Sequence, residues 1–415
     1  MIYDLKYGNE VVSFELPAAW RNQVIHHKTP LVRNIEETLL EALSNPIGSA
    51  PFEEWARGRN LLIIVSDVTR YSGAERFLPI LYQKYLSYST VKILFALGNH
   101  RKQTEEERRR IVSDLVFENV TCIDHDCFDP AQLVSLGHTS SGLEITVNRA
   151  LTEADGVVLT GSISFHYLAG FGGGRKIIFP GISGYETILG IHKMVFNRDK
   201  PGKHERAQSA ILEGNPMHEE MMEALAFTTT PMFLINTVLD DKRNLLNIFC
   251  GDVKSAHEEG CRWYSDHFKV AAEEKADVVV VSCGGYPKDI DFIQSHKGLE
   301  HAKGAVKEGG TMILLARCQD GPGNPNFLPW FTYPTLEEME SHVRASDKVY
   351  AQTAYSTRMK AQKYRIILVS DMDEEEVRTM GIIPKRTLDE ALAECDRNSD
   401  LVCRVVPEGS KTLCQ

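Results

Sequence analysis

The sequence predicts an α/β protein: two α/β domains with mainly parallel sheets and an interdomain cleft. Two observations predict this fold class. Short apolar, β-rich runs recur along the chain, and helix-like stretches lie between them. Runs that are apolar on both faces are typical of strands buried between helix layers, and their alternation with helices is typical of parallel sheets. The predicted strands are 61–66, 91–97, 156–160, 277–282, 311–316 and 364–370, with a last short one at 401–406.

Helices are predicted between these strands. The helix after residue 97 has the clearest start, because Thr104 precedes three glutamates in a pattern that fits a capping box. Those acidic side chains also lie at the positive end of the helix dipole. The predicted helices are 32–42, 76–87, 105–117, 218–226, 253–275, 295–307, 336–345 and 388–395.

The domain boundary is predicted near residue 270, where a long polar helix is followed immediately by a new strand. We therefore expect an N-terminal α/β domain over residues 1–270 and a C-terminal α/β domain over 271–392. The tail, 393–415, is expected to pack back on the N-terminal domain, although its strand 401–406 could return to either domain. A chain of 415 residues fits two or three domains at roughly 150 residues each.

Composition excludes several classes of protein. The 46 basic and 57 acidic residues give a net charge of −11, which argues against a nucleic-acid or anionic-membrane surface. No apolar run approaches the ~20 residues of a membrane span, and the N-terminus does not resemble a signal peptide. The nine cysteines are odd in number and form no C-x-x-C pair, which favours free thiols. We expect a soluble, cytoplasmic protein.

Polar side chains follow two of the predicted strands, at the sheet edge where α/β proteins bind ligands. Asp67, Thr69 and Arg70 follow the strand 61–66 and suit a ribose-phosphate or a carboxylate. A helix N-cap with a salt bridge explains them equally well. His100 follows the strand 91–97; a histidine there is more often structural, but the position suits a general base.

The densest signal is a glycine-rich loop after the strand 156–160. Gly172, Gly173 and Gly174 allow close approach of an anion, and Lys176 lies two residues further on. The spacing fits neither a Walker A loop nor the G-x-G-x-x-G fingerprint. His166 and His192 flank the loop at distances that do not form a short helical metal pair. A structural turn would not require these basic and imidazole neighbours, so we predict a functional loop.

One further pair lies in the C-terminal domain. Gln294 and Lys297 are three residues apart, so on a helix they share one face, and an amide beside an ammonium suits a carboxylate. Taken alone, a solvated helix start is the favoured interpretation of this pair.

Together these motifs resemble the nickel-dependent lactate racemase family. The resemblance covers most of the chain, and its specificity lies in the order of the pieces. They are Asp67-Val68-Thr69-Arg70, Gly98-Asn99-His100-Arg101, Ser164-Phe165-His166, Gly172-Gly173-Gly174-Arg175-Lys176, Pro180-Gly181, Ile191-His192, Gly285-Tyr286-Pro287-Lys288-Asp289, and Gln294 with Lys297.

The resemblance implies a cofactor and a role for each residue. The cofactor is a nickel-pincer nucleotide, pyridinium-3-thioamide-5-thiocarboxylic acid mononucleotide nickel, attached covalently to Lys176. His192 would be the protein ligand to nickel, and His100 and His166 the catalytic acid/base pair. Asp67, Thr69 and the glycine loop (Gly172, Gly173, Gly174) would bind the cofactor, while Arg70, Gln294 and Lys297 would bind the substrate.

The implied reaction is racemisation or epimerisation of a lactate-like 2-hydroxy acid. Hydride transfer to and from the cofactor through a 2-keto intermediate avoids direct deprotonation of an unactivated carbon. Partners would be the small-molecule substrate and the enzymes that make the cofactor. Two positions depart from the family pattern: Tyr71 stands where proline is common, and Ile293 where lactate racemases carry a tyrosine. Ile293 leads us to expect a substrate other than, or broader than, lactate.

Two alternatives stay open on the sequence. One is a nucleotide- or phosphate-binding enzyme that uses the glycine loop, although no acidic cluster for Mg²⁺ accompanies it. The other is a binding protein that keeps the fold without the cofactor. The presence of Lys176, His192, His100 and His166 together argues against that second alternative.

Overall fold

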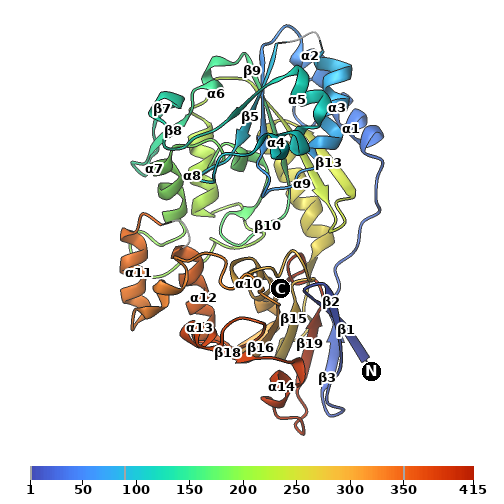
Figure 1. Ribbon diagram of the computed structural model, residues 1–415, viewed down its shortest axis with the longest axis vertical. Coiled ribbons are helices and arrows are strands. Elements are labelled where there is room, and N and C mark those ends of the chain that lie inside the picture. The colour runs from blue at the N-terminus through green and yellow to red at the C-terminus, as the bar shows by residue number, and fades with distance from the viewer. Residues whose placement is uncertain (1, 88–89, 349–350) are drawn as a thin grey trace. The chain divides into compact units, whose positions relative to one another are not determined.

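The computed structural model describes residues 2–87, 90–348 and 351–415. The chain forms two compact units (Figure 1). The N-terminal unit comprises residues 30–195 and 204–266, and the C-terminal unit comprises 1–29, 196–203 and 267–415. Both units are α/β, as predicted.

The N-terminal unit is built on a six-stranded sheet with the order β13-β12-β9-β4-β5-β6. All neighbouring strands are parallel except β12 and β13, which are antiparallel. Every residue of β4 is buried, which explains why it is apolar on both faces. The strands are β4 (Leu61–Ser66), β5 (Val91–Ala96), β6 (Thr121–Asp124), β9 (Gly156–Ser162), β12 (Met232–Leu239) and β13 (Leu245–Gly251).

Helices and two small hairpins complete this unit. Its core packs Phe77 of α3 and Phe233 of β12 with the apolar residues of β4 and β5. The hairpins are β7 (Leu133–His138) with β8 (Glu144–Asn148), and β10 (Phe165–His166) with β11 (Gly170–Phe171). The helices are α1 (Ile35–Ser44), α2 (Phe52–Ala56), α3 (Ala74–Leu81), α4 (Glu105–Val112), α5 (Asp114–Asn119), α6 (Ala150–Glu153), α7 (Tyr185–Lys193), α8 (Pro216–Leu225) and α9 (Val253–Phe268).

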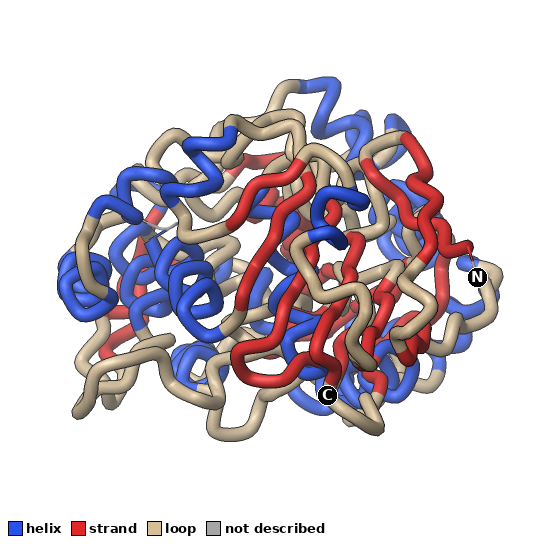
Figure 2. The backbone as a smooth tube through the Cα atoms, turned by 90° about the horizontal axis from the view of Figure 1, so that it is seen from below, coloured by secondary structure: helices blue, strands red, loops and turns tan. Residues whose placement is uncertain are grey.

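The C-terminal unit has its own six-stranded sheet, with the order β18-β17-β16-β15-β19-β3 and every pair parallel. Figure 2 traces the strands of the chain in red and its helices in blue. The strands are β3 (Arg21–Val24), β15 (Ala276–Ser282), β16 (Val306–Leu315), β17 (Arg365–Val369), β18 (Ile383–Lys385) and β19 (Val402–Val406). Two pairs lie outside this sheet: antiparallel β1 (Ile2–Tyr7) and β2 (Glu10–Glu15), and parallel β14 (Lys269–Val270) and β20 (Leu413–Cys414).

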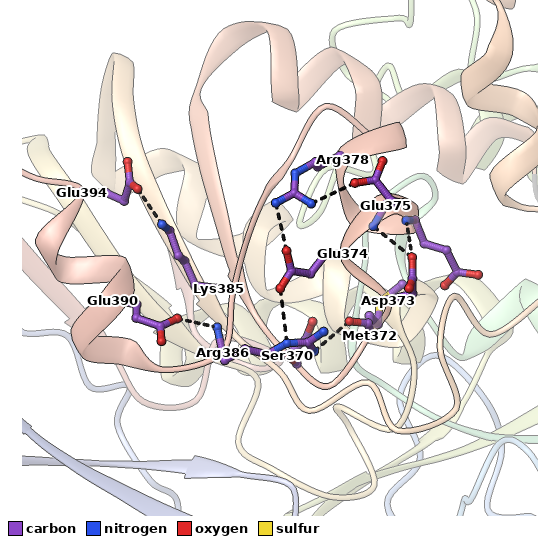
Figure 3. Close-up of polar contacts among 11 residues, drawn as sticks. Ser370, Met372, Asp373, Glu374, Glu375, Arg378, Lys385, Arg386, Glu390 and Glu394 are labelled. Atoms are coloured by element: carbon purple, nitrogen blue, oxygen red, sulfur yellow. Dashed lines mark hydrogen bonds and ion pairs between the residues drawn. The ribbon is translucent and has the colours of Figure 1, made fainter.

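The C-terminal helices are α10 (Phe292–Ala302), α11 (Leu336–Ala345), α12 (Ala351–Lys363), α13 (Glu374–Thr379) and α14 (Leu388–Ala393). Polar contacts fix the edge strand β18, as Figure 3 shows. The Arg386 guanidinium donates to the carbonyls of Ser370 (3.0 Å) and Met372 (2.9 Å). The Lys385 ammonium pairs with Glu394 at 2.6 Å. These contacts tie β18 to the loop after β17 and to the end of α14.

The chain passes from the N-terminal to the C-terminal unit between Asp266 and His267, but both ends of the chain differ from the expectation. Residues 1–29 belong to the C-terminal unit, because β3 adds to the edge of its sheet beside β19. The tail 393–415 also lies in this unit rather than on the N-terminal domain, because β19 pairs with β15 and β20 with β14. Pairing between strands so distant in sequence leaves no local pattern that would predict it.

Element ends also differ from the predicted ones. The predicted helix 253–275 ends at Phe268, and the short strand β14 follows it directly. The predicted helix 105–117 is broken at Ser113, whose φ of 77° lies in the left-handed region and whose side chain caps α5. The capping box at Thr104 is present, with Thr104 and Glu107 each bonding the other's backbone N–H.

Candidate active site

Asp67 and His100 meet at the carboxyl edge of the N-terminal sheet, where β4 and β5 end. The Asp67 side chain is buried, and its Oδ2 lies 2.6 Å from His100 Nδ1. The other oxygen, Oδ1, accepts a hydrogen bond from the Thr69 hydroxyl at 2.8 Å. The Nδ1–H of His100 donates to the Asp67 carboxylate. The Nε2 of a neutral His100 therefore carries a lone pair and can act as a base.

Gln103 stabilises the loops that carry this pair through hydrogen bonds. No sequence motif indicates this role. Its buried side chain accepts a hydrogen bond from the Val68 backbone N–H at 2.9 Å. The Gln103 backbone N–H donates to Asp124, and Asp124 also pairs with Arg108 at 2.7 Å. These bonds join the loops after β4 and β5 to the last residue of β6, so they fix the loops that carry Asp67 and His100.

The glycine loop packs tightly against protein. A Cβ atom at Gly173 would lie 2.6 Å from Asn236 Oδ1, and one at Gly174 would lie 2.6 Å from the His257 ring. Both glycines also have positive φ, which disfavours any side chain. The Gly174 N–H donates to Asn236 Oδ1 (2.8 Å), and the Gly172 N–H donates to the Ser164 carbonyl (2.8 Å). These two N–H groups therefore serve the fold rather than a phosphate.

Arg175 is the largest fully buried side chain among the described residues. Its guanidinium donates to the carbonyls of Ala169 (2.7 Å) and Phe171 (3.2 Å), which holds the loop in place from inside. The same guanidinium lies 3.3 Å from His257 Nε2, while that nitrogen lies 2.9 Å from the Gly172 carbonyl. Burial, and then the charge of Arg175, keeps the pKa of His257 well below its usual range, so that ring stays neutral.

Lys176 follows Arg175 in a short 3-10 turn, Gly174–Ile177. Burial, and then the positive charges of Arg175 and Arg70, lower the pKa of its amine to about 7. The structure thus brings Lys176 within the electrostatic reach of Arg70. Near neutral pH about half of the amine is unprotonated, and that form is a nucleophile.

This pKa predicts that, in protein made without cofactor, Lys176 is chemically labelled at a lower pH than an ordinary lysine. Only the unprotonated amine reacts with acetic anhydride, so acetylation should rise through about pH 7 and level off above it. A peptide lysine of ordinary pKa, ~10.4, serves as the internal standard and should still be gaining reactivity at pH 9. Peptide mass spectrometry measures both. If the acetylation of Lys176 rose with pH in the same way as that of the standard lysine, the lowered pKa would be contradicted.

His192 lies in the last turn of α7, and its ring is already oriented. Its Nδ1 donates to the Ile188 carbonyl at 2.7 Å, which leaves Nε2 with a lone pair in the neutral ring. Burial, and then the nearby charge of Lys176, lowers the pKa of His192 to about 4. A neutral imidazole with one nitrogen held by a carbonyl is the form that binds metal ions.

His166 has the opposite hydrogen-bonding pattern to His100. It ends β10, and its Nδ1 accepts from the backbone N–H groups of Leu168 (3.2 Å) and Ala169 (3.1 Å). The proton of a neutral His166 therefore resides on Nε2, which is a donor. Leu168 and Ala169 begin the loop that Arg175 holds from inside.

Gln294 and Lys297 lie in the first turns of α10 in the C-terminal unit. Lys297 Nζ donates to Gln294 Oε1 at 2.7 Å, so the two share one helix face as predicted. Ile293, Gln294 and Lys297 are partly exposed, whereas Ser295 and His296 between them are buried. Asp291 caps the helix by accepting from the Gln294 N–H at 2.7 Å.

The described residues contain neither a cluster of metal-binding side chains nor a helix that could span a membrane. Over residues 2–87, 90–348 and 351–415, no group of three or more His, Cys, Asp and Glu side chains is arranged to hold a metal ion. In the same described part of the chain, no helix combines the length and apolar character needed to cross a bilayer.

Comparison with known proteins places this chain in a family. Residues 7–203 match the model of the lactate racemase N-terminal domain, and residues 271–413 match that of the lactate racemase C-terminal domain. The chain belongs to the lactate racemase family. It is 33% identical to the lactate racemase of Thermoanaerobacterium thermosaccharolyticum, covering 99% of this chain and 98% of that protein. It is 32% identical to the lactate racemase of Lactiplantibacillus plantarum, covering 90% and 89%.

Solved structures agree with this family assignment. The lactate racemase apoprotein of T. thermosaccharolyticum superposes with a TM-score of 0.90 at 32% identity over the full length of both chains. A protein from Thermotoga maritima shares the fold, with a TM-score of 0.64 at 19% identity, covering 93% of this chain and 99% of that one. The predicted fold class and the resemblance drawn from the motifs are confirmed, and the protein is an isomerase of the racemase type.

Proposed function

We propose that this chain is a racemase or epimerase of a lactate-like 2-hydroxy acid that uses a nickel-pincer nucleotide bound covalently to Lys176. The observation that carries the proposal is the electrostatic interaction of Lys176 with the His192 ring. The Lys176 charge acts on the His192 ring, so an amine that is partly unprotonated near pH 7 lies close to a neutral, oriented imidazole. An acyl-accepting amine and a single imidazole donor are what the covalent anchor and the metal ligand require.

The donor set fits a cofactor that brings its own soft ligands. His192 would bind nickel through Nε2, and the other donors would come from the carbon and two sulfurs of the pincer group. When bound, this group supplies a carbon that accepts a hydride from the substrate and returns it. The glycine loop, held by Arg175, Asn236 and His257, would present Lys176 to it.

His100 and His166 would exchange the hydroxyl proton of the substrate. The hydrogen bond from His100 Nδ1 to Asp67 leaves Nε2 as an acceptor, while the bonds to His166 Nδ1 leave its Nε2 as a donor. One neutral histidine is thus set as a base and the other as an acid. Loss of the hydroxyl proton to a histidine and of hydride from the carbon gives a planar 2-keto acid. Return of the hydride to the other face of the carbon, with a proton from the other histidine to the oxygen, gives the mirror-image product.

Arg70, Gln294 and Lys297 would bind the substrate carboxylate. The positive charges of Arg70 and Lys297 and the amide of Gln294 are suited to binding an anion. The hydrogen bond from Lys297 to Gln294 holds these two side chains on one face of α10. Ile293 shares the partly exposed part of that turn. An apolar side chain there changes the shape and polarity of the pocket, so we expect a substrate other than, or broader than, lactate. A panel of 2-hydroxy acids tests that expectation.

His192→Ala should lower nickel binding without affecting the covalent attachment of the cofactor to Lys176. We expect protein made together with the cofactor enzymes to keep the covalent adduct on Lys176 but to lose most of its nickel, because the only protein ligand proposed for the metal is gone. Intact-mass spectrometry measures the adduct and elemental analysis the nickel. His138→Ala, an exposed histidine on β7, is the matched control. Full nickel content in His192→Ala would remove this residue from the metal site.

The phosphate-binding alternative loses support from the loop. The N–H groups of Gly172 and Gly174 are bonded to Ser164 and Asn236, and the Arg175 guanidinium is buried against carbonyls. A loop that binds phosphate instead directs its N–H groups and its basic side chains toward the anion.

A further inference from the structure

A short hairpin leaves the N-terminal unit directly after α7. Residues Phe196–Lys203, here called the anchor hairpin, lie in the C-terminal unit although the matching N-terminal family domain extends to residue 203. Phe196 and Lys203 pair across its base, and the Asn197 N–H donates to the Gly202 carbonyl at 3.0 Å. One step further along the chain, the His204 N–H donates to the Val195 carbonyl at 2.8 Å.

The anchor hairpin continues the helix that carries His192. That helix, α7, ends at Lys193, and Val195 is the last residue before the hairpin. The Met194 N–H donates to the Ile191 carbonyl, so the helical path runs almost to the hairpin base. Only Met194 and Val195 separate the end of α7 from the anchor hairpin.

Glu340 of α11 holds the hairpin. Its carboxylate is buried and accepts the Gly202 N–H with both oxygens, at 2.9 and 2.8 Å. It also accepts from the Tyr355 hydroxyl (2.8 Å) and from Arg344 Nε (2.8 Å). Bonds from N–H donors to a buried carboxylate are strong, and removing the carboxylate would leave several buried donors unsatisfied.

The same two donors also pack on Phe196 at the other end of the hairpin. The Tyr355 ring meets Phe196 edge to face at 5.2 Å between centroids, and the Arg344 guanidinium lies 4.7 Å from the Phe196 ring centre. Phe196 is buried, whereas residues 198–201 at the tip are exposed. One carboxylate thus organises the contacts to both ends of the hairpin.

We propose that Glu340 is a positioning residue for His192, which acts by clamping the anchor hairpin and so fixing the end of α7. This inference rests on the proposed function, because it takes His192 to be the nickel ligand. It assigns a role in the metal site to a residue of α11, far along the chain from His192.

Proteolysis of cofactor-free, full-length protein tests the clamp alone. Arg198 lies at the exposed tip, and native-state cleavage there tracks how often the hairpin opens. In Glu340→Gln, an amide nitrogen replaces one acceptor and faces other donors. We expect trypsin to cut after Arg198 about tenfold faster or more. Glu338→Gln removes a charge from an exposed position on the same helix, and trypsin should cut this variant at the wild-type rate. Unchanged cleavage in folded Glu340→Gln, or an equal rise at every site, would overturn the clamp.

Nickel content tests the positioning role. In protein made with the cofactor enzymes, Glu340→Gln should carry the adduct on Lys176 but several-fold less nickel per adduct than Glu338→Gln. Tyr355→Phe, which removes only one donor to Glu340, should give a smaller change in the same direction and serves if Glu340→Gln fails to fold. Faster cleavage with an unchanged nickel-to-adduct ratio would refute the positioning role. Absence of any adduct from wild-type protein would instead refute the proposed function and leave the proteolysis result standing.

Discussion

Lys176→Ala protein made together with the cofactor enzymes should carry no covalent adduct and should show no racemisation above background. The expected loss is complete, because no other lysine is assigned the attachment. Burial and the charges of Arg175 and Arg70 lower the pKa of the Lys176 amine to about 7, so that a reactive fraction is unprotonated near neutral pH. Intact-mass spectrometry, followed by peptide mapping, measures the adduct.

Two further variants make this result specific. Lys176→Arg keeps a positive charge but has no amine that can be acylated near neutral pH, so it should also lack the adduct. Lys102→Ala removes an exposed lysine and should keep it. An adduct that persists on Lys176→Ala, or that maps to another lysine, would show that the anchor is assigned to the wrong residue.

His100→Ala and His166→Ala should each slow racemisation in both directions by ~10²–10⁴, with Lys176 still modified. Each histidine is the base for one enantiomer and the acid for the other, so neither direction can proceed normally without both. The measurement is turnover of a panel of 2-hydroxy acids, starting from each enantiomer, by folded and cofactor-loaded variants.

The exposed His138 supplies the matched control, and His138→Ala should turn over like wild type. A purely structural role would give a different pattern for His100→Ala or His166→Ala: lower stability or lost cofactor without a specific catalytic defect. Near wild-type turnover by either variant on the best substrate would remove that histidine from the mechanism.

The sequence was a good guide where a signal is local. Strands such as β4 are apolar on both faces because they are buried on both, and the capping box at Thr104 is readable within four residues. Asp67 and His100 could be placed at one sheet edge because they follow neighbouring predicted strands. Their hydrogen bond of 2.6 Å gives that placement a physical link.

The sequence was a poor guide where partners are distant. Gln103 binds the backbone of a residue 35 positions away, and His257 meets a glycine carbonyl 85 positions away. Neither belongs to a recognisable motif, so only the folded chain identifies them. The same reason explains why the sequence does not assign residues 1–29 to the C-terminal unit: β3 joins the C-terminal sheet beside β19, across almost the whole chain. Gly173 and Gly174 were assigned to an anion, but Asn236 and His257 occupy the space beside them.

The most direct test of the central claim is the intact mass and nickel content of wild-type protein made with and without the cofactor-making enzymes. With them, the account predicts a mass increase that maps to Lys176, about one nickel per adduct, and racemisation of a 2-hydroxy acid. Without them, it predicts the unmodified mass of the chain and no activity. Racemisation by protein that has the unmodified mass and no nickel would contradict it.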